Sequence, residues 1–176
     1  MISIFGFSKV TDHLFLSNAA AASKATLLTD HHITCVINVS LECPAFVVPD
    51  LVEYLHVPVA DLPETPLYDH FQAISHKINE VAEAGGRTLI HCAAGISRSP
   101  TLCLAYLMEH HRLTLLAAHT HLQQCRPIIR PNIGFWTQLI AYEVALFGKN
   151  TVRIIDSPIG RIPDIYGTEA KNMIPF

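Results

Sequence analysis

The chain has 176 residues, of which 50% are hydrophobic and 15% are charged, and its formal net charge at pH 7 is −3. This composition excludes an intrinsically disordered chain and fits one compact domain. The slight acidic balance gives no sign of a nucleic-acid partner. No apolar run approaches the ~20 residues that cross a bilayer, so we expect no stable membrane insertion.

The cysteines and the first residues bear on the compartment. Five cysteines are present, an odd number without a CxxC pair, which favours reduced thiols over the disulfide framework of a secreted domain. Residues 1–7 carry no positively charged region and no clear cleavage site, so we expect no signal peptide. The expected location is the cytoplasm, with the nucleus as an additional candidate compartment and the mitochondrion left open.

Short apolar stretches alternate with helical patterns through the first half of the chain. Strands are expected where β-branched and apolar residues cluster, at 14–16, 33–39, 54–59 and 87–91. Helices are expected at 19–28, 67–84, 100–110, 115–124 and 133–147. This order predicts an α/β fold with a central, mostly parallel sheet of about five strands flanked by helices.

The segment between the strand at 87–91 and the helix at 100–110 carries the chemistry. It reads His91-Cys92-Ala93-Ala94-Gly95-Ile96-Ser97-Arg98-Ser99-Pro100. A tight loop of small residues before a helix can turn its backbone N–H groups inward, where they and the helix N-terminus bind an anion. Gly95 permits a backbone conformation that other residues resist. The segment therefore predicts a phosphate site.

Cys92 stands at the first position of this loop, where the same donors stabilise its thiolate. Arg98 follows six residues later, and its planar fork can hold two phosphate oxygens. Ser99 can donate a hydrogen bond to the sulfur when the sulfur leaves. A nucleophile, an anion cradle and a clamp within seven residues indicate phosphoryl transfer through a covalent thiophosphate. The alternative is an ordinary strand-to-helix turn with a buried, inert cysteine.

This segment resembles the His-Cys-x5-Arg-Ser/Thr signature of the protein tyrosine phosphatase superfamily, in its dual-specificity branch. The resemblance extends roughly over residues 8–148 and is supported by the stretches 37–40, 59–61, 105–108, 126–132 and 134–135. It implies a protein tyrosine phosphatase-like fold and a catalytic domain at residues 1–148. Residues 149–176 resemble the C-terminal extension of a small subgroup of atypical dual-specificity phosphatases, and we expect this extension to pack on the domain.

The resemblance also implies an activity. It implies hydrolysis of phosphotyrosine and phosphoserine/phosphothreonine in proteins through a cysteinyl-phosphate intermediate, with no metal or other cofactor. Phosphorylated proteins are the expected partners, and the family suggests MAP kinases among them. The phosphate is expected to bind the Arg98 side chain and the backbone of Ala93, Ala94, Gly95, Ile96 and Ser97.

The departing oxygen of the substrate needs a proton at neutral pH. The family takes it from an aspartate on an upstream loop, and Asp61 in Val59-Ala60-Asp61-Leu62-Pro63 matches that position. Glu64 and Asp69 are the substitutes if Asp61 is an ordinary turn carboxylate. Three further residues are expected to support the loop. His91 is expected to do so by a hydrogen bond, and Ser40 and Asn132 match family stretches that support the phosphate loop.

Two other functions stay open on the sequence alone. The same chemistry can act on a phosphoinositide or an RNA 5′-phosphate, although such loops usually carry basic residues where this one has Ala93, Ala94, Ile96 and Ser97. A non-catalytic phosphoprotein-binding module is disfavoured because a nucleophile, an arginine and a candidate acid are all present.

The chain has eleven histidines, which raises the question of a metal site. No HExxH occurs, and no Cys/His cluster has the spacing of a closed zinc site. The histidine pairs are His31-His32, His110-His111 and His119-x-His121. We interpret them as a solvated face and expect no metal ligands among them.

Overall fold

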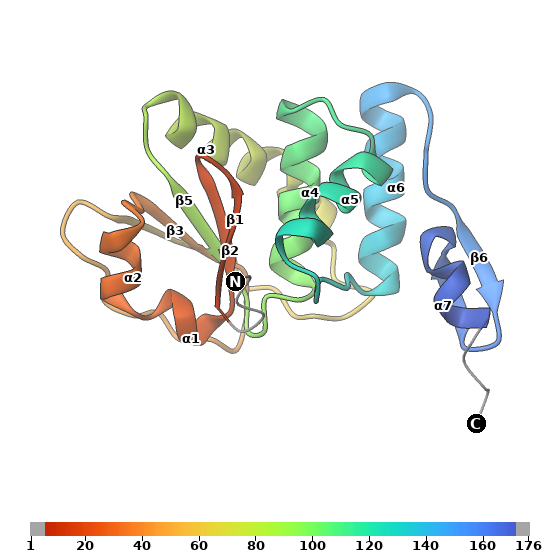
Figure 1. The fold of residues 1–176 in the computed structure, drawn as a ribbon, viewed down its shortest axis with the longest axis horizontal. Helices are drawn as coiled ribbons and strands as arrows, with labels where there is room; N and C mark the ends of the chain where they lie inside the picture. The colour runs from red at the N-terminus through yellow and green to blue at the C-terminus, as the bar shows by residue number, and fades with distance from the viewer. Residues whose placement is uncertain (1–5, 172–176) are drawn as a thin grey trace.

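The computed structural model describes residues 6–171, which form a five-stranded sheet with helices on both faces (Figure 1). The strand order is β1-β2-β5-β3-β4, in which the first pair is antiparallel and the other pairs are parallel. The strands are β1 (Phe7–Thr11), β2 (Leu14–Ser17), β3 (Cys35–Asn38), β4 (Glu53–His56) and β5 (Thr88–His91). The expected α/β fold with a mostly parallel sheet is confirmed.

Residues 1–5 and 172–176 lie outside the described part of the chain. Most of the segment examined for a signal peptide lies there, together with the outer ends of the two expected regions, 1–148 and 149–176.

Six helices pack on the sheet or on the helices beside it, and alternate side chains of each strand serve different faces. The helices are α1 (Ala19–Ala22), α2 (Ala25–Asp30), α3 (Phe71–Glu83), α4 (Arg98–His110), α5 (Leu115–Cys125) and α6 (Ile133–Phe147). Ile90 belongs to the larger core with α3 to α6, whereas its neighbour Leu89 belongs to a smaller core with α1 and α2. A strand buried on both faces needs apolar residues at successive positions, which is why β5 shows no polar alternation.

Apart from shifts of one or two residues at the ends of α4 and α5, two expected helices differ from the structure. The helix expected at 19–28 is interrupted, because the Ser23 hydroxyl bonds back to the Ala20 carbonyl (2.9 Å) and Lys24 is extended. The helix expected at 67–84 begins as the 3₁₀ turn η1 (Leu67–His70), which follows Pro66. Neither difference moves the strands that lead into the candidate site.

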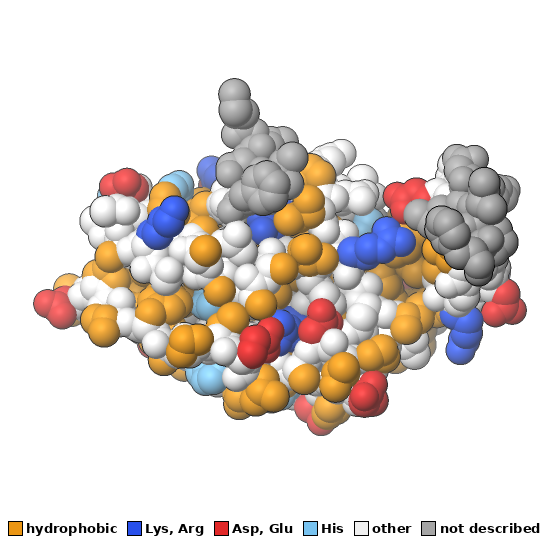
Figure 2. Space-filling model, turned by 90° about the horizontal axis from the view of Figure 1, so that it is seen from below, with side chains coloured by type: hydrophobic (Ala, Val, Ile, Leu, Met, Phe, Trp, Pro, Cys, Tyr) orange, Lys and Arg blue, Asp and Glu red, His pale blue; other side chains and the backbone are white. Residues whose placement is uncertain are grey.

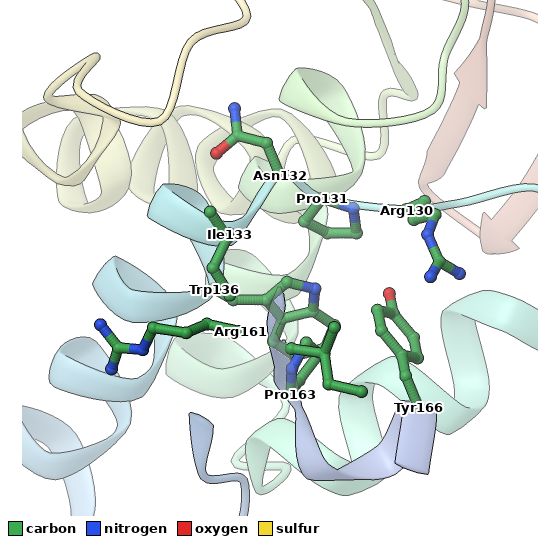
Figure 3. Close-up of a pocket in the computed structure, with 9 residues that line it drawn as sticks. Arg130, Pro131, Asn132, Ile133, Trp136, Arg161, Pro163 and Tyr166 are labelled. Atoms are coloured by element: carbon green, nitrogen blue, oxygen red, sulfur yellow. The ribbon is translucent and has the colours of Figure 1, made fainter. Parts of the chain in front are cut away.

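The extension forms a hairpin of β6 (Ile154–Ser157) and β7 (Gly160–Pro163), followed by η2 (Asp164–Tyr166) and α7 (Gly167–Lys171). The ring of Tyr166 meets that of Trp136 on α6 edge-on, at 5.8 Å between centroids. Figure 3 shows both rings beside a cavity of about 260 Å³ at the start of α6. Val152, Ile162 and Tyr166 of the extension join the larger core, so this part of the extension packs on the helical layer.

The surface shows no concentration of positive charge on the face drawn in Figure 2. Lys and Arg side chains are separated there by hydrophobic, acidic and neutral ones, as far as the described residues show. Within residues 6–171, no helix combines the length and the hydrophobicity that a membrane span requires.

Candidate active site

The central strand β5 ends at His91, and the next residues form the cysteine loop (residues 92–98), which leads into α4. Because β5 pairs with β2 on one side and β3 on the other, the loop leaves the sheet at the middle of its carboxyl edge. The thirteen-residue helix α4 directs the positive end of its dipole toward this point. The fold therefore places a favourable potential for an anion at the loop.

The Cys92 sulfur accepts two hydrogen bonds inside the loop. The Gly95 backbone N–H donates from 3.3 Å and the Ser99 hydroxyl from 3.2 Å. The cysteine is only 2% exposed, and its sulfur faces the donors that the sequence assigned to it. These contacts do not fit an inert core thiol, which packs against apolar atoms without polar partners.

The loop is held from behind through its carbonyl groups. Four successive carbonyls each accept a hydrogen bond from outside the loop: Ala93 from Ala19 N (3.0 Å), Ala94 from Arg126 Nη2 (3.2 Å), Gly95 from Arg126 Nε (2.8 Å) and Ile96 from Arg130 N (2.6 Å). In a trans peptide the N–H points opposite to the carbonyl. Because these carbonyls point outward, the N–H groups of residues 94–97 face the interior of the loop.

Arg98 is paired with a residue that sequence reasoning missed. The Glu42 carboxylate, on the loop after β3, accepts from Arg98 Nη1 at 2.7 Å and also from Nη2. Nη1 additionally donates to the Val59 carbonyl at 3.0 Å. The Arg98 hydrogen bond lowers the pKa of Glu42 to about 2, and the same bond raises the pKa of Arg98. Glu42 is therefore ionised at neutral pH.

The Glu42 pair leaves one edge of the Arg98 guanidinium without a partner. The Nε atom is buried and makes no hydrogen bond in the described part of the chain. Each Nη carries two hydrogens, and Nη2 uses one of them on Glu42. The Nε–H and the second Nη2–H lie on the same edge of the planar fork, which is the geometry that binds two oxygens of one phosphate.

Asp61 lies on the exposed loop after β4 and is linked to the cysteine loop through Asn132. The Asn132 amide donates to Asp61 Oδ1 at 2.9 Å, and its backbone N–H donates to the Ser97 hydroxyl at 3.0 Å. The Asn132 carbonyl oxygen also caps α6 by accepting from Phe135 N. One asparagine thus joins the candidate acid, the loop and the start of a helix. Glu64 and Asp69 have no such link among the described hydrogen bonds.

Gly134 brings the Asp61 loop close to α6. A Cβ at this position would overlap the Pro63 carbonyl oxygen and Cα. Only glycine permits this approach, so the first turn of α6 fixes the loop that carries Asp61.

The two remaining supporting residues differ in what they contact. The His91 Nδ1 donates to the Cys92 carbonyl at 3.0 Å, and burial lowers the pKa of His91, which makes the neutral ring the expected form. Ser40 makes no described hydrogen bond to the cysteine loop. Its hydroxyl donates to Asn38 Oδ1 at 2.6 Å and accepts from Cys43 N at 3.3 Å. Ser40 thus orders the turn that presents Glu42, and its support for the loop is indirect.

Other ionisable side chains in the core are poor nucleophiles. Burial raises the pKa of Cys35 to about 12 and raises that of Cys103 as well, so both thiols stay protonated.

The interpretation of the histidines as a solvated face is wrong for His119, which is 4% exposed and packs against Trp136 at 5.1 Å between ring centroids. Its position on α5 faces the extension, which the sequence spacing did not show.

Comparisons with known proteins agree with this geometry. Residues 14–145 match the family model described as "Dual specificity phosphatase, catalytic domain". The chain is 53% identical over 174 residues to human "Dual specificity protein phosphatase 18", covering 99% of this chain and 92% of that protein. It is 46% identical over 173 residues to human "Dual specificity protein phosphatase 14", covering 98% and 87%. The crystal structure of human DUSP28 superposes with a TM-score of 0.76 at 38% identity, covering 80% of this chain and 94% of that one.

Proposed function

The chain belongs to the dual specificity phosphatase family and is a dual-specificity protein phosphatase, and we propose that Cys92 is the nucleophile of its reaction. The observation that carries this proposal is the pair of donors on the Cys92 sulfur, at 3.3 Å and 3.2 Å, inside a loop whose N–H groups face inward. A thiolate and a phosphate need the same donors, so one cradle serves the nucleophile and its substrate.

In the first step the Cys92 thiolate attacks phosphorus in line with the leaving oxygen. A sulfur–phosphorus bond forms and the phosphorus–oxygen bond to the protein side chain breaks, which gives the cysteinyl-phosphate intermediate. The inward N–H groups of residues 94–97 and the free edge of Arg98 hold the equatorial oxygens. Glu42 keeps that edge turned toward the phosphate by occupying the other one.

Asp61 protonates the leaving oxygen in this step and then, as a carboxylate, takes a proton from the attacking water in the second step. Water adds to phosphorus, the sulfur–phosphorus bond breaks and inorganic phosphate leaves. Ser99 donates to the departing sulfur and stabilises its negative charge. Asn132 positions Asp61 through the 2.9 Å hydrogen bond. Both steps balance without a metal or a redox partner.

The substrates are phosphoproteins, and MAP kinases are the candidate class that the family suggests. The neutral side chains of the cysteine loop support protein substrates over phosphoinositides and RNA 5′-phosphates, whose enzymes usually carry basic residues there. A cytoplasmic location, with the nucleus as a second compartment, is part of the same proposal.

A Cys92→Ser variant tests the proposal. We expect it to lose hydrolysis of a generic aryl phosphate and of phosphopeptides while it still binds phosphate, because the cradle of N–H groups and Arg98 remains. A variant that hydrolyses at the native rate would contradict the nucleophile. Native protein that binds phosphopeptides without hydrolysing them would instead support a binding module.

A further inference from the structure

Arg126 is a charged side chain that has almost no contact with water. It follows the last turn of α5, and the residue is only 1% exposed. All four acceptors of its described hydrogen bonds are neutral oxygens: Gly6 O (3.0 Å), Ser8 Oγ (3.2 Å), Ala94 O (3.2 Å) and Gly95 O (2.8 Å). It forms no ion pair with any carboxylate in residues 6–171.

A buried guanidinium without a counter-charge is strongly unfavourable, because it stays protonated and its hydration is lost. Neutral carbonyl oxygens replace part of the lost hydration, and a negative charge within range offsets more of the cost. Burial lowers the pKa of Arg126, and the charge of Cys92 opposes this as the largest stabilising influence. The Arg126 hydrogen bonds reach the Ala94 and Gly95 carbonyls on one side of the cysteine loop, so the Cys92 sulfur within that loop is the candidate for the compensating anion.

One peptide group connects the two charges. Arg126 Nη2 donates to the Ala94 carbonyl, and the N–H of the same peptide, which belongs to Gly95, donates to the Cys92 sulfur. A cation at the oxygen end of a peptide strengthens the dipole at its N–H end. The positive charge behind the loop is thus transmitted to the sulfur in front of it through a single peptide plane.

The close approach of Arg126 is built into the loop. Gly95 has a φ of +69°, and a Cβ there would lie 2.8 Å from Arg126 Nη2 and 2.6 Å from the Ser17 carbonyl oxygen. Any larger residue would push the guanidinium off the loop. The glycine in the cysteine loop and the buried arginine on α5 are therefore parts of one arrangement.

We propose that Arg126 is the buried counter-charge of the Cys92 thiolate and that it holds the loop in the conformation that aims its N–H groups at the sulfur. Arg126 is a positioning residue, because it acts through the Ala94–Gly95 peptide and not on the substrate. The inference rests on the proposed function, since it concerns the ionisation of the same nucleophile.

The test is the pH dependence of Cys92 alkylation. Inactivation by iodoacetamide is followed as loss of aryl phosphate hydrolysis, so that the other thiols do not contribute, and the midpoint of the rate against pH is determined. For R126Q we expect the midpoint to rise by about one pH unit or more, since an opposite charge near an ionising group shifts it by that order. R126K keeps the charge but cannot bond two carbonyls in one plane, so a smaller rise is expected.

Arg130 provides the matched control. Its backbone N–H also bonds the loop, at Ile96, but its side chain lies over the Tyr166 ring at 4.3 Å and pairs with Glu169. R130Q keeps the backbone contact and removes a charge outside the loop. We expect its alkylation midpoint to equal that of the native protein.

Folded R126Q with the native midpoint would contradict the assignment. Should R126Q fail to fold, as judged by near-UV circular dichroism, R126K decides alone: a midpoint equal to the native one overturns the proposal. These outcomes are separate from a failure of the proposed function, which would show as retained hydrolysis by the Cys92→Ser protein.

Discussion

At the level of single residues, Glu42 determines which edge of the Arg98 guanidinium is free. Its carboxylate takes one hydrogen from each Nη atom, and the Val59 carbonyl takes another from Nη1. A guanidinium held on three of its five donors has little freedom left, so the entropy of orienting it is lost before the substrate binds.

We predict that Glu42→Gln lowers kcat/KM on the order of 10- to 100-fold, because the clamp is misplaced by a fraction of an ångström or more. Since the pKa of Glu42 is about 2, its charge does not change between pH 5 and 8, and the loss should be constant across that range. Steady-state kinetics with a phosphopeptide measure it. Glu80→Gln, which changes an exposed carboxylate paired with Lys77, is the control. An increase in kcat/KM for Glu42→Gln would mean that the carboxylate competes with phosphate instead.

Sequence reasoning found the cysteine loop from local spacing, and the family resemblance supplied Asp61 and Asn132, but Glu42 and the contacts of Arg126 were missed. The cysteine loop is continuous, so the spacing of Cys92 and Arg98 is visible in the sequence. Glu42 and Arg126 meet the loop only because β3 and α5 flank it. Arg126 was noted only as part of the stretch 126–132 that resembles the family, and the sequence does not say what its guanidinium binds.

At the level of elements, α6 fixes the loop that carries Asp61. The contact depends on Gly134, which lies against Pro63, and on Asn132, which caps the helix and bonds Asp61. The position of the acid is therefore set by a helix far away in the sequence.

We predict that Gly134→Ala displaces the Asp61 loop, because the added Cβ would overlap the Pro63 backbone. Proton donation matters most when the leaving oxygen is a strong base, so hydrolysis of an alkyl phosphopeptide should fall about 10²-fold. An aryl phosphate with an acidic leaving group should lose much less. The control is Thr137→Ala, an exposed position one turn further along α6. Equal losses for the two substrates would show that the glycine does not act through the acid.

The elements themselves were predictable to different degrees. The helix at 133–147 was predicted with its observed bounds, and its apolar residues and the Asn132 cap are both local features. Strand β1 was not predicted, because five residues on the edge of a sheet give little pattern. The β6–β7 hairpin was missed because its stability comes from packing: Ile162 joins the larger core, and Tyr166 packs on Trp136.

At the level of the whole molecule, histidines whose pKa falls on folding link stability to pH. His91 and His119 are buried, whereas His110 is half-buried and His111 is exposed. Burial is the main cause of the lowered pKa in all four histidines. For His119 the pKa falls from 6.5 to about 4. Below pH 6.5 the unfolded chain binds protons that the folded chain does not. The stabilising effect is therefore complete above pH 6.5 and is lost as the pH falls toward 4.

We predict that the free energy of unfolding falls between pH 6.5 and 4 and that His119→Phe makes this fall shallower. One proton bound only by the unfolded state changes the free energy of unfolding by about 1.4 kcal/mol per pH unit. Phenylalanine at position 119 removes the titrating group but keeps the ring contact with Trp136. Urea unfolding at several pH values measures the slope. His32→Asn is the control, since His32 is exposed and Asn tolerates its φ of +55°. Identical slopes for His119→Phe and the native protein would contradict the prediction.

The most direct test of the account is to isolate the intermediate. An Asp61→Asn protein should form the cysteinyl phosphate from an activated aryl phosphate but hydrolyse it slowly, because water lacks its base. After rapid acid quench and proteolysis, mass spectrometry should find one added phosphoryl group on the peptide that contains Cys92. A phosphoryl group on another residue, or turnover with no labelled peptide in the quenched samples, would contradict the account.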